Sequence, residues 1–157
     1  LLFTYVRSKA EADLNAYDAY FGNLRAPLVR ANEFAPTVSD TPNRFLVRGT
    51  LEVGHGIQVL PVLEVRDGFP YSLLDEAQQF VGPRHGGGRF PRLVTLDLQV
   101  QRRVRVWRWE PRVGLRMFNV LNRFTPRDVL ANVDVAGAPI FDNPVPRWLG
   151  ITLWFDR

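Results

Sequence analysis

The chain has no cysteine, a single lysine, a single methionine and no long apolar run. Without cysteine there are no disulfides and no thiolate metal sites, although the cellular compartment stays open. The uninterrupted apolar runs cover only a few residues, far fewer than the roughly 18 that a transmembrane helix needs. No signal-peptide pattern opens the chain and its first residue is Leu1, so we expect a mature chain or a fragment.

Positive charge is carried almost wholly by arginine. The 157 residues include 20 Lys and Arg against 16 Asp and Glu, and Lys9 is the one lysine. A formal charge of +4 permits contact with nucleic acid or anionic lipid. The arginines alternate with apolar residues instead of forming a run, and no nucleic-acid-binding module is recognised. We therefore expect no nucleic-acid partner.

One stretch, residues 112–122, alternates between two kinds of side chain. Its apolar and polar residues fall on opposite parities: Val113, Leu115, Met117 and Leu121 against Arg112, Arg116 and Asn122. A period of two is typical of a strand with two unlike faces. The stretch is about as long as a membrane-spanning strand, roughly 9–11 residues. A half-buried strand of a soluble protein alternates in the same way, so this stretch alone leaves both interpretations open.

Five further segments read as strands: an apolar, aromatic opening at 1–9, and alternating segments at 43–53, 57–66, 92–106 and 147–157. Gly54, His55 and Gly56 form a connection short enough for a hairpin turn, and 107–111 is a second short connection. Pro61 weakens the assignment of 57–66 as a central strand, because proline cannot donate to the ladder.

The remaining connections are long and lack periodicity: 10–42, 67–91 and 123–146. Connections therefore alternate between long and short, which in an antiparallel meander places every long loop on one rim. Outer-membrane barrels are built in this way. We predict an all-β fold, a six-stranded antiparallel meander forming a curved open sheet with three long loops on one rim, as part of a larger transmembrane β-barrel. Since about eight strands make the smallest usual barrel, the first and last strands should be unpaired edges.

The polar row of these strands does not suit a dry protein core. It includes Arg48, Glu52, Glu64, Arg66, Asp97, Gln99, Arg103 and Arg116. Burying such groups has a large desolvation cost, so they suit bulk solvent or a water-filled barrel interior. The apolar row distinguishes the two: it is uncovered in a barrel segment and buried in a soluble sandwich. Its marker residues are Val47, Leu51, Val59, Leu63, Leu96, Leu98, Leu115 and Ile151.

Six short blocks follow one another along the chain: Tyr5-Val6-Arg7-Ser8-Lys9, Thr41-Pro42-Asn43-Arg44-Phe45, Asp67-Gly68-Phe69-Pro70-Tyr71-Ser72, Phe90-Pro91 with Leu96-Asp97-Leu98, Phe118-Asn119-Val120-Leu121-Asn122, and Val145-Pro146-Arg147. Together they resemble the C-terminal barrel region of TonB-dependent receptors, over essentially the whole chain. The resemblance implies an outer-membrane receptor, not an enzyme, that imports a scarce nutrient such as an iron chelate, cobalamin or an oligosaccharide. It also implies four partners: outer-membrane lipid, further barrel strands, a plug domain, and an inner-membrane energy-coupling protein that acts through the plug.

The chain departs from this family in two ways. A family barrel of about 22 strands, at about ten residues each, needs roughly 220 residues in strands, whereas this chain has 157 and no plug. We therefore expect residues 1–157 to be one partial barrel segment. Outer-membrane barrels also typically finish on an aromatic residue, whereas here Asp156 and Arg157 follow Phe155.

Two of the long loops combine aromatic and cationic side chains. We mark as ligand-binding candidates Tyr17, Tyr20, Phe21, Arg25 and Arg30 in the first loop, and Phe80, Arg84 and His85 in the second. Such residues suit a sugar or an anionic chelate. Ordinary loop residues without a ligand would give the same pattern. The alternative function is a soluble all-β binding module that uses its long loops for recognition.

Little in the sequence points to catalysis, a metal or a cofactor. His55 falls in a tight turn and His85 in a glycine-rich loop, with no serine or carboxylate placed near either by sequence. Asp13 opens like a calcium loop, but the next ligand positions fail the pattern. The segment 84–89 lacks the lysine and helix of a phosphate-binding loop, so we expect an exposed, flexible loop there. We predict no catalytic, metal or cofactor residues.

Overall fold

The computed structural model describes residues 1–13, 34–77 and 79–155. Every regular element in these ranges is a β-strand. No helix long and apolar enough to cross a membrane is present in them.

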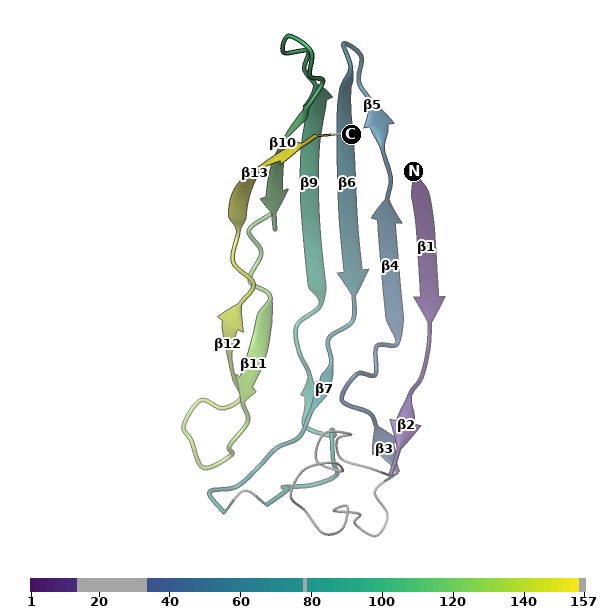
Figure 1. Ribbon diagram of the computed structural model, residues 1–157. Coiled ribbons are helices and arrows are strands. Elements are labelled where there is room, and N and C mark those ends of the chain that lie inside the picture. Colours follow the sequence, from purple (N-terminus) through teal and green to yellow (C-terminus); the bar gives the residue numbers. More distant parts are fainter. Residues whose placement is uncertain (14–33, 78, 156–157) are drawn as a thin grey trace, which may run out of the picture.

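One antiparallel sheet dominates the structure (Figure 1). Its strands lie in the order β1 (Leu2–Arg7), β4 (Asn43–Arg48), β6 (Ile57–Arg66), β9 (Leu93–Arg103), β10 (Arg112–Phe118) and β13 (Trp148–Trp154), and β5 (Leu51–Glu52) also pairs with β6. Within the described residues β1 pairs only with β4, and β13 only with β10, so both edges of the sheet are open. The predicted all-β fold, with about six antiparallel strands in a meander, is confirmed.

Pro61 lies in the middle of a central strand, and the structure shows how β6 accommodates it. The registers of β4 and β5 place Gly49 and Thr50 opposite Pro61 and Leu60, where the pairing with β6 is interrupted. On the other side of β6, the pairing with β9 runs unbroken through Pro61 and Leu98. The N–H that proline lacks therefore falls on the β4–β5 side, and only that ladder is broken.

The described parts of the three long connections lie at one end of the sheet, opposite the two short turns (Figure 1). They contain three short strand pairs: β2 (Glu11–Ala12) with β3 (Ala35–Pro36), β7 (Pro70–Tyr71) with β8 (Gly88–Arg89), and β11 (Pro126–Leu130) with β12 (Ile140–Pro144). The connection 123–146, expected to be irregular, is therefore largely a hairpin. Its strands have no clear alternation and begin or end at Pro126 and Pro144, so sequence periodicity does not reveal them.

Most strands are shorter than predicted, the predicted strand 43–53 is divided into β4 and β5, and two strands stop early at turns with positive φ angles. β10 stops at Phe118 instead of 122, because Asn119 and Asn122 adopt positive φ angles of 48° and 49° and form a turn. The Asn122 amide donates to the Asn119 carbonyl at 2.8 Å. Asparagine adopts this conformation more readily than most residues. β9 stops at Arg103 instead of 106, ahead of the tight turn at Trp107, whose φ is 53°.

The register sorts the side chains onto two unlike faces. On one face, apolar residues align across five strands in a row of Leu51, Val59, Val100, Leu115 and Ile151. Among the described aliphatic and aromatic residues, only Ala35 and Ala131 are buried, and both lie at the loop end. The eight marker residues are all at least partly exposed, and Ile151 reaches 75%. No second layer covers this apolar face in the described part of the chain.

Candidate functional site

The opposite face has a continuous chain of side-chain hydrogen bonds, which we call the polar ladder: Arg116, Gln99, Gln101, Gln58 and Glu52. Arg116 Nε donates to Gln99 Oε1 at 2.9 Å, and Gln99 Nε2 donates to Gln101 Oε1 at 3.0 Å. Gln101 Nε2 donates to Gln58 Oε1 at 2.8 Å, and Gln58 Nε2 donates to Glu52 Oε1 at 3.4 Å. The polar ladder therefore connects β10, β9, β6 and β5 across the sheet.

Burial along β9 is the reverse of that in an ordinary soluble strand. Gln99 and Gln101 are 9% and 8% exposed, whereas Val100 between them, on the opposite face, is 40% exposed. The buried amides are tolerated because each has a hydrogen-bond partner. The polar face is thus the more covered and more organised of the two.

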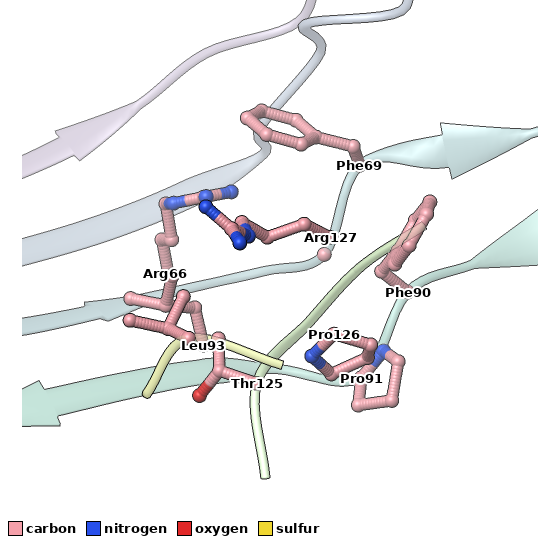
Figure 2. A pocket seen from close by; sticks show the side chains of 10 residues that line it. Arg66, Phe69, Phe90, Pro91, Leu93, Thr125, Pro126 and Arg127 are labelled. Carbon is pink, nitrogen blue, oxygen red and sulfur yellow. The ribbon is translucent and has the colours of Figure 1, made fainter. Parts of the chain in front are cut away.

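At the loop end of this face, two of the long connections and the adjoining ends of β6 and β9 line a cavity of about 260 Å³, which we call the rim pocket (Figure 2). Its lining residues come from the end of β6, the start of β9 and the hairpin region of β11 and β12: Arg66, Gly68, Phe69, Phe90, Pro91, Leu93, Thr125, Pro126, Arg127 and Val145. None of these ten residues is acidic. The rim pocket therefore combines two arginines with aromatic and apolar walls.

Close backbone contacts form the wall of the rim pocket. A Cβ on Gly68 would lie 1.8 Å from the Phe90 carbonyl oxygen, so this position accepts only glycine without a shift of the backbone. The Phe90 amide donates to the Phe69 carbonyl at 2.9 Å, and the Val145 amide donates to the Thr125 carbonyl at 2.9 Å. These contacts bring segments from two long loops next to the end of β6.

The two arginines of the rim pocket are held in place by different partners. The Arg66 guanidinium lies 4.1 Å from the centre of the Phe69 ring, a cation–π contact, and its Nε is 3.5 Å from Glu64 Oε1. Arg127 Nη2 donates to Asn143 Oδ1 at 2.8 Å. Figure 2 shows both arginines among the side chains that line the rim pocket, together with the Phe69 ring. Two cations therefore line one pocket whose ten lining residues include no carboxylate.

A buried ion pair ties the loop segments to each other. Asp40 is 2% exposed; its Oδ1 accepts from the Ala10 amide at 2.7 Å, and its Oδ2 pairs with Arg89. Arg89 also donates to the Gly68 carbonyl at 3.1 Å. Burial raises the pKa of the Asp40 carboxyl, but the Ala10 hydrogen bond and Arg89 outweigh burial, so the pKa lies below its ordinary value.

The candidates predicted in the first loop, Tyr17, Tyr20, Phe21, Arg25 and Arg30, lie outside the described residues. In the second loop, Phe80 and His85 both line a wide hollow of about 630 Å³ next to the rim pocket.

Arg84 differs from the expectation of an exposed loop. It is 2% exposed, and its guanidinium donates to the Ala12 carbonyl. The neighbouring His85 ring contacts the Pro36 carbonyl. Both side chains thus hold the second loop against the pair β2 and β3. The tripeptide of glycines beside them hid this role, because glycine runs usually indicate a mobile loop.

The sequence does not reveal the rim pocket as a site. Phe69 and Phe90 belong to the blocks that resemble the family, and Arg66 falls on the polar row, but Arg127 lies in a segment whose sequence has no periodicity. The alternation of apolar and polar residues along 57–66 puts Arg66, the last residue of that strand, on the polar face. This position is the sequence signal that points toward the rim pocket.

No protein-family model, curated protein or solved structure matches the chain. In the described ranges, no three histidine or carboxylate side chains are grouped so that they could hold a metal ion.

Proposed function

We propose that this chain forms part of the wall and loop rim of an outer-membrane β-barrel of the TonB-dependent receptor kind, and that it serves nutrient import and not catalysis. The observation that carries the proposal is the reversed burial of the two faces. Apolar side chains such as Leu115 and Ile151 are 45% and 75% exposed, whereas Gln99 and Gln101 are covered. A sheet with lipid on one side and a hydrated interior on the other has this arrangement.

The partners follow from the same geometry. Outer-membrane lipid would cover the apolar face, and further barrel strands would pair with the open edges at β1 and β13. A plug domain would meet the polar ladder inside the barrel, and an inner-membrane protein would supply energy through that plug. The nutrient itself would be an iron chelate, cobalamin or an oligosaccharide, captured at the rim where the three long connections meet.

Aromatic residues at the opposite end of the sheet support the same orientation. Trp107 and Trp109 in the short turn are 80% and 58% exposed, and Trp109 meets Phe155 edge-on with ring centres 6.3 Å apart. Tryptophan favours the boundary between lipid and water, because one part of its ring is apolar and its N–H donates a hydrogen bond. A soluble binding module would instead need a further layer of protein over the apolar face.

The test uses two adjacent positions on opposite faces of β9. Because residues 1–157 contain no cysteine, Leu96→Cys and Thr95→Cys each create a single labelling site within them. A fluorophore at 96 should be quenched by spin-labelled lipid, and one at 95 by aqueous iodide, in outer-membrane preparations of the expressed gene product. A protein recovered in soluble fractions, or equal iodide quenching at both positions, would overturn the proposal in favour of the soluble module.

A further inference from the structure

We infer that the rim pocket binds a compact anion, a phosphate or a group of carboxylates, between Arg66 and Arg127. This inference deepens the proposed function, because it gives a chemical class to the group by which the ligand is held. Only the biological role of anion binding rests on the proposed function. The evidence for the pocket is its geometry, which does not depend on that function.

The arrangement of cations is the first support. Two arginines from separate segments, Arg66 from β6 and Arg127 from β11, line one small pocket (Figure 2). Like charges repel, so an anion bound between two cations that line one small pocket would stabilise this arrangement. Here none of the lining residues is acidic. A bound anion would supply the missing negative charge.

The neighbouring acid does not neutralise the pair. Glu64 Oε1 accepts from Arg44 Nε at 2.9 Å, while Arg66 Nε is farther from the same oxygen, at 3.5 Å. One carboxylate is therefore shared between two arginines on adjacent strands. Arg127 lies on a different segment, where its own polar contacts with Asn143 are to uncharged groups.

Both arginines are also oriented before a ligand binds. Stacking on Phe69 holds the plane of the Arg66 guanidinium, and that side chain is 19% exposed. The Asn143 side chain and carbonyl hold Nη2 and Nε of Arg127. A guanidinium has five N–H donors, so each arginine keeps donors for an oxyanion, and a planar fork suits phosphate or carboxylate oxygens.

The size of the rim pocket sets the size of the bound group. At about 260 Å³ it lies below the roughly 300–1,000 Å³ of pockets that enclose a drug-sized molecule. A phosphate, or the carboxylates of a small acid, would fit, whereas an entire iron chelate would extend into the neighbouring hollow lined by Phe80 and His85. The class of ligand is therefore an anion, or a larger molecule held by its anionic end.

The experiment is calorimetric titration of the purified chain in detergent at low ionic strength, with inorganic phosphate, citrate and neutral glucose as separate probes. We expect phosphate or citrate to bind and glucose not to bind. Arg127→Gln and Arg66→Gln should each weaken binding about tenfold or more, because each removes charge-assisted hydrogen bonds. Arg123→Gln is the matched control: it removes the same charge from an exposed position outside the pocket and should leave binding unchanged.

Arg127→Lys keeps the charge but loses the planar fork, so it should fold normally and bind with intermediate affinity. If amide exchange shows that Arg127→Gln disturbs the β11–β12 hairpin, the affinity of Arg127→Lys is the measurement that tests the role of Arg127. Unchanged affinity in the Arg66 and Arg127 variants, or an equal loss in Arg123→Gln, would overturn the inference, as would no binding of either anion. Failure of anion binding with lipid quenching intact at residue 96 rejects the pocket alone; the reverse result rejects the barrel alone.

Discussion

At the scale of single residues, several charged side chains hold loop segments together through hydrogen bonds and an ion pair. Arg89 joins Asp40 to the Gly68 carbonyl, and Arg84 joins the second loop to Ala12. Their burial depends on hydrogen bonds to the charged groups, since an unpartnered buried charge would destabilise the fold by several kcal/mol. Gly68 plays a different part, allowing two backbone segments to approach more closely than any side chain would permit.

Asp40 makes the loop end sensitive to acid. Its pKa in the folded chain lies below that in the unfolded chain, which is about 3.9. Its contribution is therefore fully present above pH of about 4 and is lost as the pH falls through the lower, folded pKa. In urea titrations at pH 6 and pH 3, wild type should have lost part of this contribution at the lower pH. Asp40→Asn should be less stable by about 2 kcal/mol at pH 6 and less dependent on pH.

Asp142→Asn, an exposed position on β12, is the control for that comparison and should resemble wild type. If Asp40→Asn is as stable as wild type at pH 6, the ion pair with Arg89 does not hold the loop segments together.

At the scale of the strands, the two faces of the sheet are stabilised by different interactions. The polar ladder couples strands through side-chain hydrogen bonds, whereas the apolar row contributes only where lipid or protein covers it. Alternation in the sequence predicted both rows. It did not predict where strands end, because Asn119 and the turn at Trp107 take positive φ angles that alternation does not reveal.

Gln99 joins Arg116 to Gln101 within the polar ladder, so its replacement should destabilise the fold more than replacement of an ordinary strand residue. Gln99→Leu leaves the Arg116 Nε without its acceptor and should cost about 2–3 kcal/mol in the free energy of unfolding. The double variant Gln99→Leu with Arg116→Met removes both partners and should recover part of that loss. The measurement is the urea midpoint of each variant in detergent, with Val100→Leu as a control on the other face. Strictly additive effects of the two single substitutions would contradict the coupling.

At the scale of the whole molecule, the sheet is a single layer with two open edges (Figure 1). Each edge strand exposes unpaired N–H and C=O groups, which are templates for pairing with further strands. The rim has its own small cluster, where the rings of Tyr71, Phe90 and Phe141 meet with centres 5.4–6.1 Å apart. In the described chain, the apolar face of the sheet is therefore uncovered, whereas side chains at the loop end pack against one another.

Amide exchange should show the two edges directly. In chain 1–157 alone, alternate amides of β1 and β13 should exchange rapidly, because their N–H groups point away from the only paired neighbour. Amides of β6 and β9, which have partners on both sides, should exchange far more slowly. Uniform protection along β1 and β13 would show that the edges are paired, either with each other or with a second copy.

The sequence by itself determined the strands of the large sheet, the short turns and the two rows, because a period of two is a local property of the extended backbone. The sequence also determined that the long connections share one end of the sheet, because long and short connections alternate along an antiparallel meander. Only the tertiary structure decided the rim pocket and the burial of Arg84. Arg66, Phe90 and Arg127 are far apart in sequence, and no local pattern records that two of the long connections fold together around one cavity. The same holds for the hairpin of β11 and β12, whose strands form through pairing with each other and not through the preferences of their residues.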